Sequence, residues 1–264
     1  MAGAVASPPP ISAGGWLRIA IRVTAMLLVL LVCVSLYYLW RIGGQENPWP
    51  RRFLAAVGKL AGVKLRISGE RVACGEFLLA NHVSWIDIPA LAAAAGAAFV
   101  AHDGLSANRI LGWLCVMNKT VFIARHDRTT IQRQIEQVRA AIRGTGALTI
   151  FPEGTTSDGS GLLPFKSALL SALEPLPEGV AVQPVLLDYG PEAAQIAWTD
   201  NEPGETNFKR ILARRHPVEL TVCFLPPLSG TDLTNRKTIA AAARNAMVRE
   251  LQTRRGGADY RVAL

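Results

Sequence analysis

A run of 18 residues without a charged side chain, VTAMLLVLLVCVSLYYLW at 23–40, constrains the fold of this chain most strongly. A helix of that length is just long enough to cross the hydrocarbon core of a bilayer. Tyr37, Tyr38 and Trp40 lie at the end of the run, where an interfacial aromatic belt is expected. The sequence therefore predicts a membrane helix.

The alternative for this run is a cleaved signal peptide, which needs small residues at a cleavage site after the apolar segment. No such site follows, because Arg41 ends the run directly. Two arginines, Arg18 and Arg22, precede the run. Four basic residues follow it, namely Arg41, Arg51, Arg52 and Lys59. This excess predicts that the body of the protein faces the cytoplasm.

The segments on either side of the run also carry patterns. Residues 1–15 are rich in Pro, Ala, Gly and Ser and are predicted to be a disordered tail. Residues 51–67, RRFLAAVGKLAGVKLRI, place apolar residues at helical spacing with basic residues between them, which is typical of a helix on a membrane surface. Packing of that helix on the protein's own core is the alternative. Residues 16–67 are thus predicted to be a membrane-anchoring helix plus an amphipathic segment.

Beyond residue 67, short apolar runs alternate with helical patterns. Strands are predicted at 77–80, 97–101, 121–124, 147–151, 180–188 and 218–225. Helices are predicted at 130–143, where isoleucine and valine recur at helical spacing, and at 235–254. The alternation predicts an α/β domain over residues 68–264, with a sheet covered on both faces.

Composition limits the class of partner. The net charge of +8 fits attraction to an anionic surface, either lipid headgroups or nucleic acid. A nucleic-acid binder is expected to have a basic stripe with interleaved aromatic residues, whereas the basic residues here are scattered. The four cysteines lie far apart without a CxxC pair, and there is no HExxH motif, so no zinc site or disulfide framework is predicted.

The stretch FLLANHVSWIDIP at 77–89 places His82 and Asp87 directly after a predicted strand. On one helix these two residues would lie about 140° apart, so a turn must bring them together. A carboxylate folded back onto the imidazole fixes its tautomer and raises its basicity, which suits a histidine that takes a proton from a hydroxyl. For this motif alone, a structural histidine that caps a helix is the alternative.

Three further blocks follow in order. VFIAR lies at 121–125, TIFPEGTTSDGSGLLPF at 149–165, and VQPVLL around Pro184. Together with the His82–Asp87 block they resemble the glycerolipid acyltransferase family, whose best-known members are the 1-acylglycerol-3-phosphate acyltransferases. The resemblance covers about residues 75–230. It implies an α/β acyltransferase domain with a mixed sheet flanked by helices, here preceded by an N-terminal membrane helix.

The resemblance also implies roles for individual residues. His82 would be the general base for an acceptor hydroxyl that attacks the thioester of acyl carrier protein or coenzyme A, and Asp87 would orient its ring. Glu153 and Gly154 would shape the acceptor site beside His82. No acyl-enzyme is required, which agrees with the absence of a GxSxG elbow from the sequence. No cofactor or metal is implied.

The headgroup site departs from the family pattern. Arg125 and Lys166 would bind an anionic headgroup. In the phosphatidic-acid-forming members the FPEG block continues as G-T-R-S, whereas here Thr155 and Thr156 follow Gly154. Thr156 therefore stands where an arginine is expected to meet the acceptor's phosphate. The variant EGTTSDG resembles bacterial acyltransferases that act on lyso-ornithine lipid, whose headgroup is an amino acid.

We therefore expect a membrane-bound O-acyltransferase acting on a lysolipid, in a bacterial inner membrane with its catalytic domain facing the cytoplasm. The first predicted acceptor is 1-acyl-sn-glycerol-3-phosphate, giving phosphatidic acid, and lyso-ornithine lipid is the alternative. The expected partners are membrane lipids and an acyl thioester, without nucleic acid. A non-catalytic lipid-binding protein is the alternative from another class. It would be expected to lack His82, Asp87 or Glu153, and all three are present.

Overall fold

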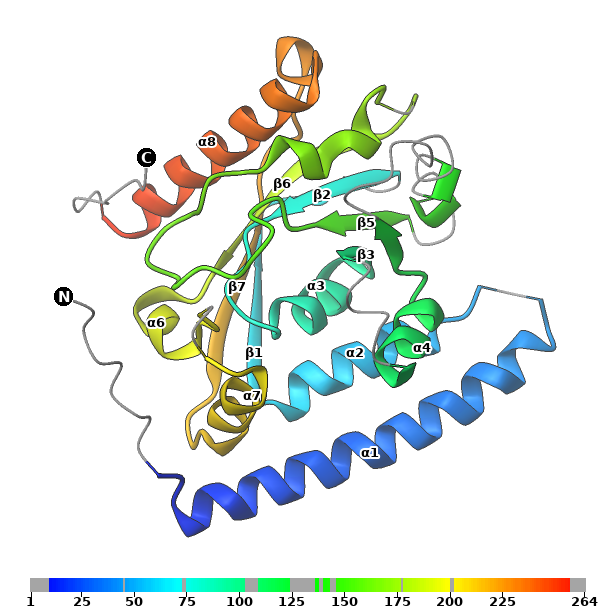
Figure 1. The fold of residues 1–264 in the computed structure, drawn as a ribbon, viewed down its shortest axis with the longest axis vertical. Coiled ribbons are helices and arrows are strands. Elements are labelled where there is room, and N and C mark those ends of the chain that lie inside the picture. Colours follow the sequence, from blue (N-terminus) through cyan, green and yellow to red (C-terminus); the bar gives the residue numbers. More distant parts are fainter. Residues whose placement is uncertain are drawn as a thin grey trace.

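A seven-stranded sheet forms the centre of the computed structural model (Figure 1). The structure describes residues 10–44, 46–72, 75–102, 109–123, 136–137, 140–142, 146–176, 178–199 and 202–256. The strands are β1 (Val63–Ser68), β2 (Glu76–Ala80), β3 (Ala98–His102), β4 (Val121–Ile123), β5 (Ala147–Ile150), β6 (Ala181–Asp188) and β7 (Val218–Phe224). The six predicted strands are confirmed as β2 to β7, each to within one residue at either end.

The sheet is mixed, as the sequence predicts. Its strand order is β1-β7-β6-β2-β5-β3-β4. The five neighbours from β6 to β4 run parallel to one another, while β7 is antiparallel to β6 and parallel to β1. Because parallel strands end at the same edge, the loops after β6, β2 and β5 meet there, which is where α/β proteins place their ligands.

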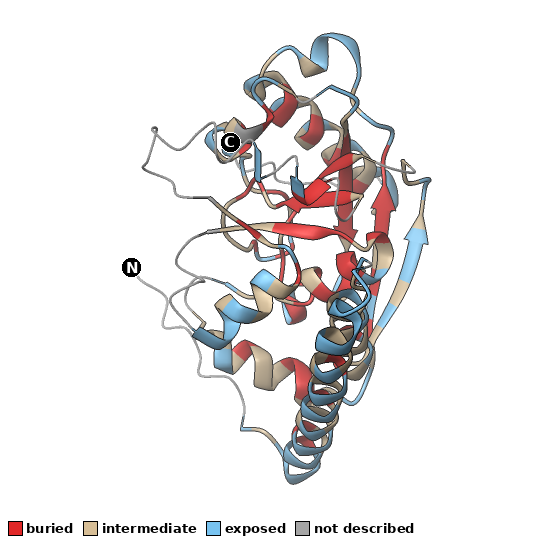
Figure 2. Ribbon diagram, turned by 90° about the vertical axis from the view of Figure 1, so that its right-hand side faces the viewer, coloured by how far each residue is buried: buried red, intermediate tan, exposed pale blue. Residues whose placement is uncertain are grey.

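Helices cover both faces of the sheet. They are α1 (Ala13–Arg41), α2 (Trp49–Leu60), α3 (Asp87–Ala95), α4 (Arg109–Met117), α6 (Ala193–Ile196), α7 (Gly204–Ala213) and α8 (Arg236–Arg254), with short 3₁₀ helices η3 (Ser167–Leu173), η4 (Gly190–Glu192) and η5 (Gly230–Leu233). Phe77 and Leu79 of β2 join the core beneath α8, whereas Leu78 and Ala80 join the core beneath α3. The strand is therefore apolar at successive positions, and the sheet is the most buried layer of the molecule (Figure 2).

The helix predicted at 235–254 is confirmed as α8. The side chain of Asn235 accepts hydrogen bonds from the backbone N–H groups of Lys237 and Thr238, which are groups without partners inside the helix. The helix predicted at 130–143 lies largely outside the described residues, and its described parts, 136–137 and 140–142, are helical.

The N-terminal helix is longer than the apolar run that predicts it. α1 begins at Ala13, where the Ser12 hydroxyl accepts a hydrogen bond from the Gly15 N–H. Residues 13–15 therefore belong to the helix and not to the expected disordered tail, while residues 1–9 lie outside the described residues. By its length of 29 residues and its composition, α1 could cross a membrane.

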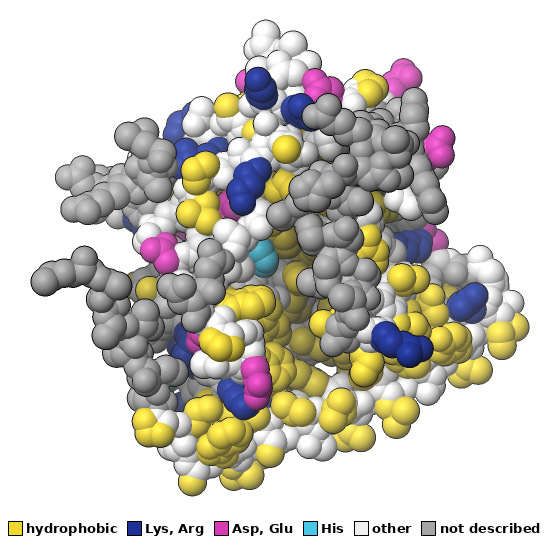
Figure 3. Space-filling view, in the orientation of Figure 1, with side chains coloured by type: hydrophobic (Ala, Val, Ile, Leu, Met, Phe, Trp, Pro, Cys, Tyr) yellow, Lys and Arg dark blue, Asp and Glu magenta, His cyan; other side chains and the backbone are white. Residues whose placement is uncertain are grey.

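α1 also lies against the body of the protein. The Arg18 and Arg22 side chains donate 2.8 Å hydrogen bonds to the Ala213 and Leu212 carbonyls at the end of α7, where helical carbonyls lack partners. α1 also exposes many apolar side chains, which Figure 3 shows along the helix, and α4 exposes several more. The exposed large hydrophobic residues of the two helices are Trp16, Leu17, Ile21, Leu27, Leu28, Leu31, Val32, Tyr38, Leu39, Trp40, Ile110, Leu111, Trp113 and Val116. An apolar surface of this extent suits contact with lipid.

The amphipathic helix expected over 51–67 is wrong in its second half. α2 ends at Leu60, and Val63–Ser68 form β1, which pairs along its whole length with β7. The reason is a change of period: Val63 and Leu65 are half-buried, while Lys64 is exposed, and this alternation fits a strand. α2 packs against both α1 and α3. The helix therefore packs on the protein itself, which was the alternative to a helix on a membrane surface.

Candidate active site

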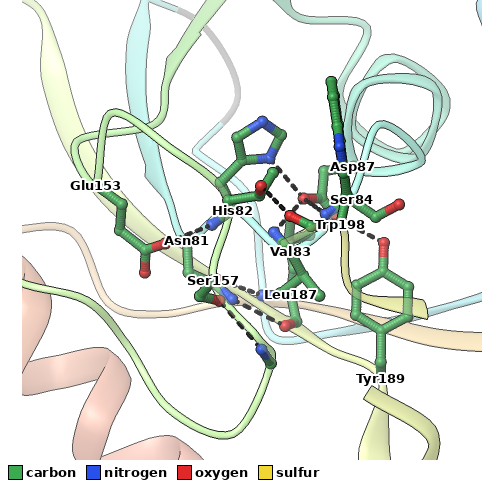
Figure 4. Close-up of polar contacts among 12 residues, drawn as sticks. Asn81, His82, Val83, Ser84, Asp87, Glu153, Ser157, Leu187, Tyr189 and Trp198 are labelled. Atoms are coloured by element: carbon green, nitrogen blue, oxygen red, sulfur yellow. Dashed lines mark hydrogen bonds and ion pairs between the residues drawn. The ribbon is translucent and has the colours of Figure 1, made fainter. Parts of the chain in front are cut away.

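The candidate site lies where β2, β5 and β6 end side by side. His82 follows β2 by two residues, the Phe151–Gly154 segment follows β5, and Tyr189 follows β6 directly. The parallel register of these strands brings the three loops together at one edge of the sheet. Figure 4 shows the side chains from these loops gathered around His82.

A tight turn joins His82 to Asp87, as their spacing predicts. Asp87 is the first residue of α3, and its Oδ2 lies 2.7 Å from the His82 Nδ1. The same oxygen accepts hydrogen bonds from the backbone N–H groups of Val83, at 2.6 Å, and Ser84, at 2.9 Å. Asp87 is fully buried. The backbone thus fixes the carboxylate, and the carboxylate fixes the ring.

Tyr189 holds the other oxygen of the same carboxylate. Its hydroxyl donates a hydrogen bond to the Asp87 Oδ1. Burial raises the pKa of Tyr189 well above its ordinary value, and the charge and hydrogen bond of Asp87 raise it further, so the phenol keeps its proton and remains a donor. A His82 Nδ1 that donates to Asp87 leaves the Nε2 as the acceptor nitrogen of the ring.

Phe151 fixes the plane of the imidazole. Its ring stacks on His82 with the centroids 4.1 Å apart and 17° between the planes. Phe99 of β3 stacks in turn behind Phe151. The His82 side chain keeps 18% of its surface exposed, and it lines a large cavity. The ring is therefore held on one edge and one face while it remains accessible from the cavity.

Glu153 lies beneath the loop of His82. Its carboxyl oxygens accept hydrogen bonds from the backbone N–H groups of His82, at 3.3 Å, and Leu163, at 3.2 Å. The pKa of Glu153 is raised to about 8, mainly by burial and to a smaller extent by the charge of Asp87. The two hydrogen bonds act in the opposite direction and lower the pKa. The carboxyl points at the backbone, not along the imidazole ring (Figure 4). In this position Glu153 connects the loops after β2 and β5.

The residues after Glu153 reach the cavity. Gly154, Thr155 and Thr156 all line it. Gly154 has a φ of 71°, and a side chain there would come within 3.1 Å of Leu169 and 3.3 Å of the Lys166 Nζ, so glycine is required. Because the Lys166 amine lies next to Gly154, it is close to the cavity wall, and the Lys166 residue is exposed. Arg125, the remaining predicted headgroup ligand, lies outside the described residues.

The cavity has a volume of about 810 Å³ and two chemically different ends. His82, Thr155 and Thr156 line the end at the sheet. The other end is lined by apolar side chains of α1, α2 and α4, which include Met26, Leu30, Val34, Trp49, Phe53, Leu54, Leu111 and Leu114. A cavity of this size can hold a long apolar chain. Within the described residues, His, Cys, Asp and Glu do not gather in a group of three that could hold a metal ion.

Residues of the loop that follows α6 also line the cavity, although the sequence carries no motif by which they could be recognised. The Trp198 N–H donates a 2.8 Å hydrogen bond to the Val83 carbonyl, and the Thr156 hydroxyl donates to the Trp198 carbonyl. Thr199 and Glu202 of this loop line the cavity. Tyr189 was missed as well, although its position directly after a strand predicted at 180–188 is a signal that could have located it.

The fold agrees with comparisons to known proteins. Residues 65–188 match a family model described as Acyltransferase. A lyso-ornithine lipid O-acyltransferase of Rhodobacter capsulatus is 31% identical over 255 residues, which cover 91% of each chain. The chain therefore belongs to the acyltransferase family, and it is a lysolipid acyltransferase.

Two further relatives bear on the fold and on the acceptor. A 1-acyl-sn-glycerol-3-phosphate acyltransferase of Neisseria gonorrhoeae is 36% identical over 121 residues, 46% of this chain and 47% of that protein. The crystal structure of the 1-acyl-sn-glycerophosphate acyltransferase PlsC of Thermotoga maritima superposes with a TM-score of 0.59 and 19% identity, covering 92% of this chain and 100% of that chain. The predicted acyltransferase fold is thereby confirmed.

Proposed function

We propose that this enzyme transfers a fatty acyl group from an acyl thioester to the free hydroxyl of a lysolipid with an amino-acid headgroup, of the lyso-ornithine type. The observation that carries the reaction is the His82–Asp87 contact at the wall of an apolar cavity. From the sequence, this acceptor, lyso-ornithine lipid, is the alternative to 1-acyl-sn-glycerol-3-phosphate. The first-ranked acceptor, 1-acyl-sn-glycerol-3-phosphate, is supported by the Neisseria relative over about half of the chain.

In the proposed reaction, the His82 Nε2 takes the proton of the acceptor hydroxyl as its oxygen attacks the thioester carbonyl carbon. The new C–O bond forms, the C–S bond breaks, and the imidazolium returns the proton to the leaving thiolate. Asp87 stabilises the imidazolium and prevents the ring from turning, and Tyr189 holds Asp87. A positioned base of this kind contributes roughly 10²- to 10⁴-fold in rate.

The acyl chain is proposed to lie in the apolar end of the cavity. The side chains of α1, α2 and α4 there remove apolar surface from water, at roughly 0.8 kcal/mol for each buried methylene. Because α1 forms part of this wall and also exposes an apolar side, a chain can enter from the bilayer. The thioester donor, acyl carrier protein or coenzyme A, is expected on the cytoplasmic side of a bacterial inner membrane.

Two observations support an amino-acid headgroup over a phosphate. The relative that spans 91% of the chain carries the lyso-ornithine name. In addition, the Thr156 hydroxyl is already used by the Trp198 carbonyl, and threonine lacks the two parallel donors with which an arginine holds a phosphate. Lys166 and Arg125 are proposed to hold the carboxylate that an ornithine headgroup carries.

The experiment is acyl transfer by membranes that contain the protein, with labelled acyl donor and with lyso-ornithine lipid and lysophosphatidic acid offered in parallel. Membranes from the same host without the protein are the blank. A higher rate with lyso-ornithine lipid supports the proposed acceptor. A higher rate with lysophosphatidic acid contradicts the proposal and supports 1-acyl-sn-glycerol-3-phosphate as the acceptor.

A further inference from the structure

The charged side chains in the lining of the cavity bear on which headgroup it can hold. Among the lining residues that the structure describes, Glu202 is the one acidic side chain, and they include no lysine or arginine. Arg210, which pairs with Glu202 at 2.7 Å, is not among these lining residues, so Glu202 is the charged side chain of the pair that a ligand in the cavity would meet. A positively charged group would be favoured by the same carboxylate.

Glu202 is held in place and stays ionised. Its Oε1 accepts a 3.0 Å hydrogen bond from the Arg210 Nε, and its Oε2 accepts bonds from the Arg210 guanidinium at 2.7 Å and the Asn207 amide at 2.9 Å. Burial opposes ionisation of this carboxyl, but the hydrogen bonds from Arg210 and Asn207 outweigh it and lower the pKa of Glu202. The geometry is set before any ligand arrives, which reduces the entropy cost of binding.

The loop of Glu202 is also fixed relative to the reacting group. The Glu202 N–H donates to the Thr199 carbonyl, and Trp198 is joined by hydrogen bonds to Val83, next to His82, and to Thr156. The Trp198 indole N–H donates to the Glu202 carbonyl. Hydrogen bonds through Trp198 therefore connect Glu202 to the loops that carry His82 and the EGTTS segment.

The carboxylate keeps room for one more donor. Each carboxylate oxygen can accept about two hydrogen bonds, and the Oε1 of Glu202 accepts one, from Arg210. The side chain retains 16% of its surface exposed. A purely structural role, in which the Glu202–Arg210 pair only holds the loop in place, explains the hydrogen bonds but not why an acidic residue stands in the cavity lining.

We propose that Glu202 is a specificity-determining residue, which receives the ammonium group of the acceptor headgroup. The inference rests on the proposed function, because it names the group that distinguishes an aminolipid from a phospholipid acceptor. Thr156 and Glu202 then act together: one removes a phosphate ligand, and the other supplies a ligand for a cation.

The test uses two acceptors of nearly equal size, lyso-ornithine lipid and the same lipid with its side-chain amine acetylated. Wild-type enzyme is expected to prefer the free amine by about tenfold or more in kcat/KM, since a hydrogen bond to a charged group is involved. In Glu202→Gln this preference should fall to about threefold or less, mainly through KM for the free amine. A loop-fastening role would lower the rates with both acceptors equally and leave the preference unchanged.

Glu205→Gln is the matched control. Glu205 lies on α7 close to Glu202, pairs with Lys209, and is exposed. This variant should keep the wild-type preference. Equal use of the two acceptors by the wild-type enzyme would overturn the inference without depending on any variant, and an unchanged preference in Glu202→Gln would overturn it as well. Either result leaves the proposed function standing if lyso-ornithine lipid is still used better than lysophosphatidic acid.

Discussion

The two ends of the cavity are built by different kinds of interaction. At the sheet, His82, Asp87 and Glu153 are held by hydrogen bonds to backbone N–H groups and to each other, on loops that follow buried strands. At the far end, side chains of α1, α2 and α4 supply an apolar wall. Hydrogen bonds fix direction as well as distance, whereas apolar contacts depend on area and volume.

This difference fits the two tasks of a lysolipid acyltransferase. Proton transfer requires a base within hydrogen-bond reach of one hydroxyl, so small displacements are costly. Binding of an acyl chain needs a dry volume of suitable length and tolerates changes of shape. Substitutions at the polar end should therefore change the rate, and substitutions at the apolar end should change which chain is used.

The largest effect among three substitutions is expected for Asp87→Asn. An amide lacks the charge that stabilises the imidazolium, and its NH2 group replaces the acceptor that faces either the Tyr189 hydroxyl or the His82 Nδ1–H, so the ring is no longer held in one tautomer and orientation. We expect kcat/KM to fall by roughly 10²- to 10⁴-fold. The measurement is acyl transfer at equal protein content in membranes, and activity within about tenfold of wild type would remove Asp87 from the proposed mechanism.

A smaller effect, on selectivity, is expected for Leu114→Trp at the apolar end. The larger side chain fills part of the wall formed by α4, so long acyl chains should lose kcat/KM by about tenfold while shorter chains lose less. Val116→Trp is the control, because Val116 is on the same helix but is 65% exposed. Equal losses in the two variants would contradict the placement of the acyl chain.

The smallest effect on turnover is expected for Glu153→Gln. This substitution should instead change how the stability of the folded protein depends on pH. The folded pKa of about 8 lies above the usual 4.5, so the buried protonated carboxyl contributes stability that is fully present below pH 4.5 and is lost as the pH rises through 8. Wild type should lose about 2 kcal/mol between pH 6 and 8.

Thermal unfolding of detergent-solubilised protein at pH 6 and pH 8.5 measures this loss for Glu153. The glutamine resembles the protonated carboxyl, so the variant should lose less stability than wild type over the same interval. A wild-type enzyme whose Tm rises with pH in this interval would show that Glu153 is ionised in the folded protein, against the raised pKa.

The sequence predicted the polar end better than its surroundings. His82 and Asp87 lie five residues apart, and because helical geometry excludes a shared helix face, a turn that joins them could be predicted. Six strands were located because each is an apolar run in a sheet buried on both faces. β1 was missed, since its alternating Val63, Lys64, Leu65 and Arg66 continue a helical segment without a Pro or Asn to mark the change.

Long-range partners could not be predicted in the same way. Tyr189 contacts Asp87 across 102 positions, and Trp198 contacts Thr156 across 42. Such contacts follow from strand order, which a single sequence does not display. Glu202 is the extreme case, because only the path of the loop after α6 turns an ordinary surface residue type into part of the cavity wall.

The central claim, that His82 is the base for acyl transfer, is tested most directly by comparing His82→Ala with His216→Ala. His216 is exposed in the turn after α7 and serves as the matched control. With labelled acyl donor and lysolipid in membranes, we predict that His82→Ala loses at least about 10²-fold in rate with membrane association unchanged, while His216→Ala stays near wild type. Full transfer by His82→Ala would contradict the account.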